Sequence, residues 1–144
     1  MEKCKNSNLQ HLDLSDNTNV KGICPSLLSL NLSRNLLSMP FDLPLPSCQL
    51  QSLNLSYNKI PYYSFKIFLK TTYFPSLKVL NLDHIPLDGS IYPIQQFLEQ
   101  SLSLTSFSAV DCDFTLDSYL NIANGIKGSN HLKSADLSRN RVVH

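Results

Sequence analysis

The stretch Leu50-Gln51-Ser52-Leu53-Asn54-Leu55-Ser56-Tyr57-Asn58 decides the fold of this chain of 144 residues. It matches the pattern L-x-x-L-x-L-x-x-N. Leu53 and Leu55 alternate with polar residues, and a period of two is typical of a short strand with one apolar and one polar face. The amide of Asn58 can bond backbone groups of the next coil and close the bend after the strand. The stretch therefore predicts a short strand followed by a tight turn.

The same pattern recurs from one end of the chain to the other. Its six units begin at Leu9, Leu27, Leu50, Leu77, Leu104 and Leu132, so successive starts lie 18, 23, 27, 27 and 28 residues apart. Six matches to one template predict stacked coils that each add a strand to a parallel sheet. We expect the apolar pair of each strand to be buried and the residue between them to be exposed. These pairs are Leu12–Leu14, Leu30–Leu32, Leu53–Leu55, Leu80–Leu82, Phe107–Ala109 and Ala135–Leu137.

The segments that return the chain from one strand to the next change in character along the sequence. Residues 18–26 are too few for a helix of several turns and predict a turn, whereas residues 36–49 contain three prolines, which favour an extended path. Residues 63–71 hold few helix breakers, and Pro93 suits the first position of a second helix. A third helix is predicted to have Gly128 as its C-terminal cap. Its predicted apolar face consists of Leu116, Leu120, Ile122 and Ile126.

Two units lack the asparagine that closes the pattern. Cys112 is an accepted substitute for asparagine in this template. Ile85 cannot make the hydrogen bonds of an amide, so we expect a local irregularity there unless water satisfies the exposed backbone groups. In the core, one column is predicted to contain Leu80, Phe107 and Ala135, where a large side chain beside a small one conserves the packed volume.

Residues on the solvent face of the predicted sheet fall into columns, with one residue from each unit. The two columns nearest the strand centres consist mainly of Asn, Asp and Ser, which form either a small polar binding strip or simply the common letters of the repeat. The column just before the closing asparagine is more varied. Its members are Asp16, Arg34, Tyr57, His84, Asp111 and Arg139. Because Tyr and Arg are enriched where binding energy concentrates, we predict that a partner on the concave side contacts Arg34, Tyr57, His84 and Arg139.

Charge and motif content exclude several classes of function. The 12 basic and 11 acidic residues leave no imbalance that points to nucleic acid, and no apolar run is long enough to span a bilayer. The sequence contains no nucleophile elbow, phosphate loop or zinc-protease motif, and its four histidines have no neighbour at metal-ligand spacing. We therefore predict that the chain is not an enzyme and that it uses no metal or other cofactor.

The cysteines bear on the cellular compartment. Cys4, Cys24, Cys48 and Cys112 are widely scattered and form no C-x-x-C pair, which favours reduced thiols in a cytoplasmic protein. The first residues also lack the apolar core of a signal peptide. The alternative is an excerpt from a secreted protein whose signal has been removed. Two glycosylation sequons, which begin at Asn31 and Asn54, lie within predicted strands, so we interpret them as accidents of the repeat.

All six units, over roughly residues 9 to 140, resemble the leucine-rich repeat superfamily. The later strand-plus-helix units look like the class of the cytosolic ribonuclease-inhibitor-like proteins. The runs PIQQFLEQSLSLTSF (93–107) and NIANGIKGSNHLK (121–133) are similar to the CARMIL family of cytosolic regulators of actin filament capping. That resemblance implies a scaffold role for the repeats, because the capping-protein motif of the family lies in a C-terminal tail that this sequence does not contain.

These observations predict a right-handed α/β solenoid, with a parallel sheet on its concave face and turns or helices on its convex face. We expect one leucine-rich repeat domain over residues 1–144 that forms part of a longer array, because only residues 141–144 follow the sixth unit. An uncapped C-terminal repeat is also expected to self-associate. The predicted function is a non-catalytic module that binds another protein, in a cytosolic scaffold or regulator. The alternatives are a fragment of a CARMIL-like actin regulator or of an extracellular recognition receptor.

Overall fold

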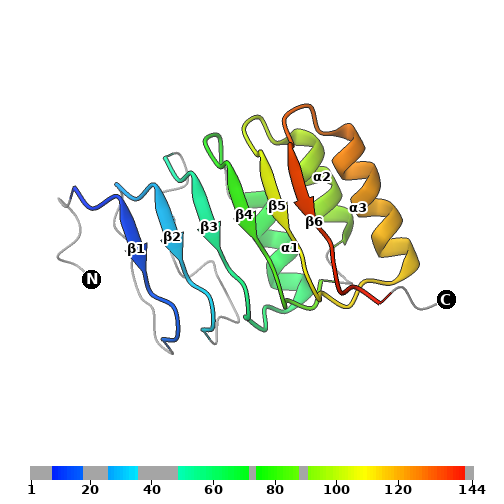
Figure 1. Cartoon of the computed structure of the whole chain (residues 1–144), viewed down its shortest axis with the longest axis horizontal. Helices are drawn as coiled ribbons and strands as arrows, with labels where there is room; N and C mark the ends of the chain where they lie inside the picture. The colour runs from blue at the N-terminus through cyan, green and yellow to red at the C-terminus, as the bar shows by residue number, and fades with distance from the viewer. Residues whose placement is uncertain (1–7, 18–25, 36–48, 72–73, 88–90, 142–144) are drawn as a thin grey trace.

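The computed structural model describes residues 8–17, 26–35, 49–71, 74–87 and 91–141. Figure 1 shows six strands side by side in the order of the sequence, together with three helices. The strands are β1 (His11–Asp13), β2 (Ser29–Asn31), β3 (Ser52–Asn54), β4 (Val79–Asn81), β5 (Ser106–Ser108) and β6 (Ser134–Asp136). The helices are α1 (Tyr62–Thr71), α2 (Ile91–Gln100) and α3 (Leu116–Gly128). The turn and the extended path predicted over residues 18–26 and 36–49 lie almost wholly outside the described residues.

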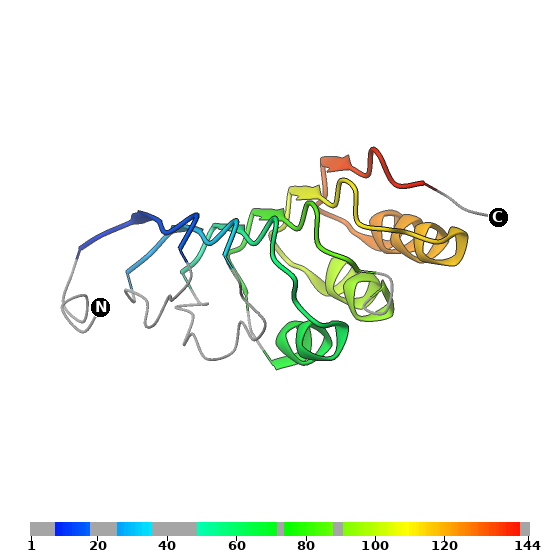
Figure 2. The same ribbon diagram turned by 90° about the horizontal axis from the view of Figure 1, so that it is seen from below.

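The six strands form one parallel sheet in sequence order, and their register repeats from coil to coil. Leu53 lies opposite Leu30 on one side and Leu80 on the other, and the outer strands continue the same row. Figure 2 shows all three helices on one face of the sheet, with the other face open. The predicted α/β architecture with a parallel sheet is therefore confirmed. Because the strands are parallel, their C-terminal ends all lie on the same side of the sheet, and the turns that follow them form a row along that side. We call this row of strand ends and turns the C-terminal edge; it runs across all six strands and is distinct from the outermost strands.

The hydrophobic core lies beneath the sheet and follows the predicted pairs in the four central units, where both members are buried. The residues between the members of these central pairs are half-exposed. In the first unit Leu12 and Leu14 are only partly buried, and so is Leu137 in the last unit. Ala135 is exposed, so the prediction that it is buried is wrong. The reason is that each outer coil has a neighbour on one side only within the described chain.

The closing asparagines form a ladder that bonds in the direction opposite to the predicted one. Nδ2 of Asn58 donates to the carbonyl of Leu32 in the preceding coil at 3.0 Å, not to the next coil. It also donates within its own coil to Leu55 and Ser56, at 2.9 and 3.3 Å. Asn35 repeats this arrangement one coil earlier. The amide supplies the donor that these buried carbonyls need where the strand ladder ends.

The two units without a closing asparagine keep the same backbone path. Cys112 is buried, and its Sγ lies 3.2 Å from the carbonyl of Leu82 and 3.4 Å from that of Val110, so the thiol is placed to donate in the amide's stead. Ile85 is buried and supplies no such donor, yet the strands on both sides keep the parallel register. The irregularity predicted at Ile85 is therefore wrong, because backbone hydrogen bonds between coils hold the turn without the amide.

The helices form in the predicted segments, with differences at their ends. α1 covers the predicted residues, whereas α2 begins at Ile91, two residues before Pro93. Proline is tolerated there because the N–H groups of the first turn have no acceptor within the helix. α3 ends at Gly128, but its cap is Ser129, whose N–H donates to the carbonyl of Ile126 at 3.2 Å. Gly128 is therefore the last helical residue and not the cap that we predicted.

α3 buries only part of its predicted apolar face. Ile122 is buried and Ile126 is partly buried, whereas Leu116 and Leu120 are exposed. Gly125 is buried against α2, where a Cβ atom would lie 3.1 Å from a backbone Cα of that helix. Such close approach leaves room only for a glycine without rearrangement. The packing of α3 on α2 therefore fixes its orientation, which leaves Leu116 and Leu120 pointing to solvent.

Candidate functional site

One residue of each coil follows its strand in the left-handed region of backbone conformation. These six residues, which we call the edge column, have φ angles between 53° and 58°, and they form the varied column of the sequence. They lie in the turns along the C-terminal edge of the sheet, where the strands of Figure 1 end. A residue other than glycine is uncommon in this region and persists there when the surrounding structure requires it. The members are Asp16, Arg34, Tyr57, His84, Asp111 and Arg139.

Backbone hydrogen bonds between coils hold the edge column in place. The N–H of Tyr57 donates to the carbonyl of Asp83 in the next coil at 2.9 Å. The N–H groups of Arg34 and His84 donate to the equivalent carbonyls of their next coils at 2.9 and 2.8 Å. The hydrogen bonding of the parallel sheet thus extends into the turns. The side chains of the column consequently start from fixed points that are about one strand spacing, roughly 4.8 Å, apart.

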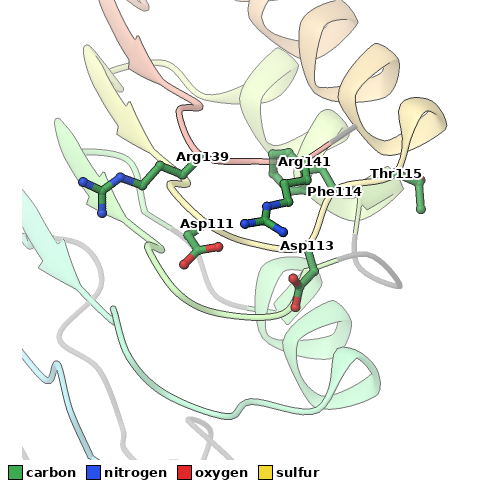
Figure 3. A pocket seen from close by; sticks show the side chains of 6 residues that line it. All are labelled: Asp111, Asp113, Phe114, Thr115, Arg139 and Arg141. Carbon is green, nitrogen blue, oxygen red and sulfur yellow. The ribbon is translucent and has the colours of Figure 1, made fainter. Parts of the chain in front are cut away.

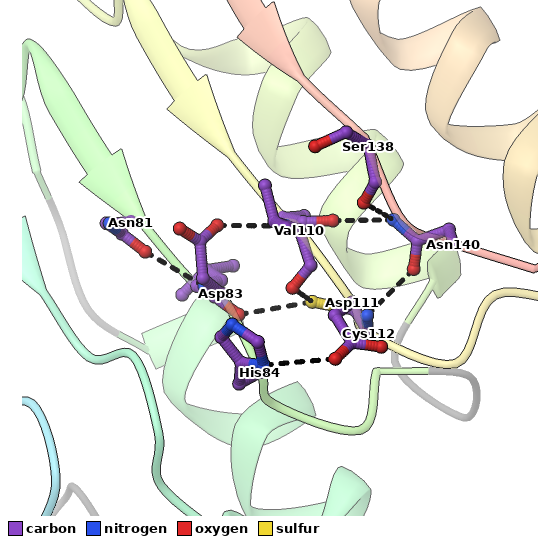
Figure 4. Close-up of polar contacts among 10 residues, drawn as sticks. Asn81, Asp83, His84, Val110, Asp111, Cys112, Ser138 and Asn140 are labelled. Atoms are coloured by element: carbon purple, nitrogen blue, oxygen red, sulfur yellow. Dashed lines mark hydrogen bonds and ion pairs between the residues drawn. The ribbon is translucent and has the colours of Figure 1, made fainter.

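The side chains of four neighbouring members touch in a continuous line. The guanidinium carbon of Arg34 lies 4.8 Å from the centre of the Tyr57 ring. The rings of Tyr57 and His84 stack with their centres 4.1 Å apart and their planes at 18°. Nδ1 of His84 lies 3.2 Å from Oδ2 of Asp111, as Figure 4 shows. The structure therefore brings together three of the four residues that we predicted to bind a partner: Arg34, Tyr57 and His84.

Arg139, the fourth predicted residue, takes no part in this line of contacts within the described chain. It lines an open pocket at the end of the column, shown in Figure 3, with a volume of about 380 Å³. Across the residues that the structure describes, the charged groups of Arg139, Arg141 and Asp113 form no ion pair. The pocket is lined by Asp111, Asp113, Phe114, Thr115, Arg139 and Arg141.

A second network of side-chain hydrogen bonds supports the turn before Asp111. In the neighbouring coil, Oδ1 of Asn81 accepts a bond from the N–H two residues later, at 2.9 Å. The fifth coil has Ser108 at that position, and a serine has no such carbonyl oxygen. The carboxylate of Asp83 in the preceding coil replaces it, accepting from the N–H of Val110 at 2.8 Å and from the hydroxyl of Ser108. Figure 4 shows how this carboxylate joins the two coils.

The small polar strip on the sheet is less available to a partner than its sequence suggested. Ser33 and Ser56 are only 8% and 5% exposed. The side-chain oxygens of Asn31 and Asn54 already accept bonds from the N–H groups of these serines, at 3.0 and 2.9 Å. The strip therefore serves largely to hold the turns. Tyr57 of the edge column is 46% exposed and offers a partner far more surface.

Metal-binding groups and activated thiols would be signs of catalysis among the described residues. Among them, no group of three or more His, Cys, Asp or Glu side chains could hold a metal ion. The buried thiol of Cys112 is a poor nucleophile, because burial raises its pKa from 9.0 to about 12 and keeps it protonated at neutral pH. What the site offers is an exposed aromatic and charged surface held on a rigid edge.

Two carboxylates of this region, Asp83 and Asp111, take part in the site although the sequence pattern did not predict it. Asp111 was placed in the correct column but was not predicted to take part, although its register beside His84 was the signal that they would meet. Asp83 was assigned to the polar strip. Its role could have been found from Ser108, because the loss of an Asn or Asp acceptor in one coil calls for a replacement from the neighbouring coil.

Comparisons with known proteins agree with the repeat architecture. The family described as Leucine Rich Repeat matches residues 8–29 and 49–70. A brassinosteroid LRR receptor kinase of Solanum lycopersicum is 35% identical over an alignment of 115 residues, and the match covers 71% of this chain and 9% of the receptor. This chain thus spans less than a tenth of that relative's length. Neither comparison supports the resemblance to the CARMIL family.

No helix in the described residues is long and apolar enough to cross a membrane. The architecture and the matches with known proteins indicate the same family. Six coils with one repeated sequence pattern, one parallel register and a ladder of closing side chains place this chain in the leucine-rich repeat superfamily.

Proposed function

We propose that this chain is a non-catalytic module that binds another protein through its edge column. The observation that carries this proposal is the unbroken line of contacts from Arg34 through Tyr57 and His84 to Asp111. Stacking and backbone bonding order these side chains before a partner arrives. Less conformational freedom is then lost on binding, so more of the contact energy contributes to affinity.

The residue types in the column support the same function. Tyr and Arg are enriched among the residues that dominate binding energy at protein interfaces. Tyr57 combines a large apolar ring with a polar hydroxyl and is substantially exposed. Arg139 and the pocket that it lines extend the surface to the sixth coil. The binding surface that we propose therefore runs along the C-terminal edge of the sheet from Arg34 to Arg139.

We place this module in a cytoplasmic scaffold or regulator, for which the buried and reduced thiol of Cys112 is the supporting observation. The alternative is a fragment of an extracellular recognition receptor, which the similarity to a plant receptor kinase favours. A CARMIL-like regulator of actin capping is a further alternative that rests on sequence resemblance alone. Disulfide mapping and glycan mass on protein from its native source distinguish an extracellular fragment from the other two.

The experiment compares the proteins that bind the wild-type chain with those that bind two triple variants. The column variant carries Arg34→Ala, Tyr57→Ala and His84→Ala. The control variant removes a cation, a tyrosine and a histidine from exposed positions elsewhere and carries Lys127→Ala, Tyr92→Ala and His131→Ala. Each chain is immobilised, exposed to an extract of its native source, and analysed by quantitative mass spectrometry. Circular dichroism first establishes that all three chains are folded.

The proposal expects at least one protein that binds the wild-type and control chains but is lost from the column variant. If every bound protein is retained by the column variant, or is lost equally from both variants, the edge column is not the binding surface. The partner identified in this way also reports the compartment in which the module works.

We also propose that the sixth coil mediates self-association. All three residues of β6 are exposed, and so are Leu116 and Leu120 of α3. Within the described chain β6 pairs with β5 on one side only, and a strand edge that is open in this way is a template for pairing with a second copy. Sedimentation velocity should show association that increases with concentration and is lost in the Leu116→Asp, Leu120→Asp double variant. A monomer at all concentrations would refute this proposal.

A further inference from the structure

We infer that the edge column recognises an acidic, extended segment of its partner. This inference rests on the proposed function and adds to it the chemistry of the partner.

The stack of Arg34, Tyr57 and His84 exposes the electron-poor edges of its groups to solvent. Arg34 and His84 belong to the coils on either side of Tyr57, so their contacts occupy the two faces of the phenol ring. An aromatic ring is electron-rich on its faces and electron-poor at its edge. With both faces covered, the exposed part of Tyr57 is its positive edge and its hydroxyl group. The edge of a stacked guanidinium likewise presents N–H donors. A partner therefore meets a row of hydrogen-bond donors and positive rims, which suits carboxylates.

The charges that remain unpaired on the column favour an anion. Within the described residues, the guanidinium groups of Arg34 and Arg139 form no close ion pair, although Asp136 interacts with Arg139 at longer range. Lys59 is exposed two residues after Tyr57. The carboxylate of Asp111 is already engaged by His84. These cations can form charge-assisted bonds with a ligand without first breaking a bond inside the protein.

The pocket at the end of the column tests this assignment, because it also contains carboxylates. Asp111 and Asp113 line the same cavity as Arg139 and Arg141. The contact with His84 leaves the negative charge of Asp111 in place, so two carboxylates and two guanidiniums line the cavity. The charged lining is therefore balanced, and the preference for an acidic segment rests on Arg34, Lys59 and the donor rims of the stack. Asp16 lies one coil beyond Arg34, outside the span between the two arginines.

The spacing of the coils fixes the length of the segment. Four coil-to-coil steps separate Arg34 from Arg139. At about 4.8 Å a step, the two arginines are roughly 19 Å apart along the edge. An extended peptide advances about 3.3 Å per residue, so it covers this distance in about six residues. The acidic side chains that reach both arginines are therefore separated by about five other residues.

The experiment uses three fluorescein-labelled peptides of seven residues with the same neutral interior. One peptide has Glu at both ends, one has Gln at both ends, and one has Lys at both ends. Fluorescence anisotropy measures their binding to the wild-type chain. We expect the Glu peptide to bind about tenfold more tightly than the Gln peptide, and the Lys peptide to bind more weakly than either. Raising the salt concentration should remove the advantage of the Glu peptide, because the bonds are exposed ion pairs.

The double variant Arg34→Gln, Arg139→Gln should lose this advantage. The matched control is Lys78→Gln, Lys133→Gln, which removes two exposed positive charges at the start of the strands, along the opposite edge of the sheet. It should bind the Glu peptide like the wild-type chain. Equal loss in both variants would show that only net charge attracts the peptide, and would overturn the inference. So would equal or tighter binding of the Lys peptide, or no binding of the Glu peptide.

This test is separable from that of the proposed function. If the column variant loses its protein partner while the Glu peptide fails to bind, the edge column is an interaction surface for a different chemistry. If the Glu peptide binds at the arginines and no protein partner depends on the column, the proposed function fails although the surface recognises carboxylates.

Discussion

The carboxylate of Asp83 accepts a hydrogen bond at 2.8 Å from the backbone N–H of Val110, 27 residues later in the chain. This bond crosses from the fourth coil to the fifth, and it replaces an acceptor that Ser108 cannot supply inside its own coil. The repeats are therefore not interchangeable units, because one coil completes the turn of the next. The turn that it completes carries Asp111, the last member of the contact line in the edge column.

Replacing Asp83 with alanine should destabilise the chain by about 1–3 kcal/mol, because the half-buried N–H of Val110 then has no acceptor. The second variant, Asp83→Ala with Ser108→Asp, restores an acceptor within the fifth coil in the arrangement that the other coils use. It should recover most of the loss when the free energy of unfolding is measured with urea. If the two substitutions simply add their destabilising effects, the replacement role of Asp83 is wrong.

The ladder of closing asparagines predicts a graded response to truncation. Asn58 is 1% exposed and pairs three buried carbonyls, so Asn58→Ala should lower the free energy of unfolding by about 2–3 kcal/mol. Asn17 makes two similar bonds, but only within its own exposed coil. Its replacement by alanine should cost less than about 1 kcal/mol, because water can satisfy the freed carbonyls. Equal losses in urea denaturation would mean that the bond to the preceding coil contributes nothing.

Position in the stack should decide the cost of a core truncation. Leu55 is fully buried between neighbouring coils, so Leu55→Ala should destabilise the chain by about 2–5 kcal/mol. Leu137 holds the same place in the sixth coil but is only partly buried. The same substitution there should cost less than half as much. Chemical denaturation measures the free energy of unfolding of both variants. Equal losses would contradict the explanation that the outer coil is less buried because it has a neighbour on one side only.

The Cys112 thiol should make stability fall in alkali. Burial raises its pKa from 9.0 to about 12, so above pH 9 the unfolded chain loses a proton that the folded chain retains. Its contribution is complete below pH 9 and is lost as the pH rises toward 12. Cys112→Ala should therefore show a flatter decline in the free energy of unfolding over this range. Parallel pH profiles for the two proteins would rule out a buried, protonated thiol.

The repeat spacing was enough to predict the strands, their parallel order and the burial of the central core. It could do so because each strand carries its own period-two pattern, which needs no information from distant residues. The orientation of α3 could not be read in the same way. Leu116 and Leu120 looked like part of its buried face, but the close approach of Gly125 to α2 decides which face is turned inward. That contact depends on two helices at once.

For the edge column too, the sequence predicts which residues belong to it but not how they contact one another. Its members could be found from the sequence, because they recur one residue before each closing position. Their contacts could not, since the stack of Tyr57 on His84 depends on the rotation of both rings. The direction of the asparagine bonds was also beyond the sequence, because the amide has backbone carbonyls within reach in its own coil and in the preceding one.

The central claim, that the edge column is the surface that meets a partner, is tested most directly by site-specific photocrosslinking. A benzophenone amino acid is introduced in place of Tyr57 in one chain and in place of Tyr92 in another. Both tyrosines are exposed, but Tyr92 lies on α2, on the covered side of the sheet. After irradiation with the partner identified by the binding experiment, position 57 should give a covalent adduct and position 92 should give none. An adduct at position 92 with none at position 57 would contradict the claim.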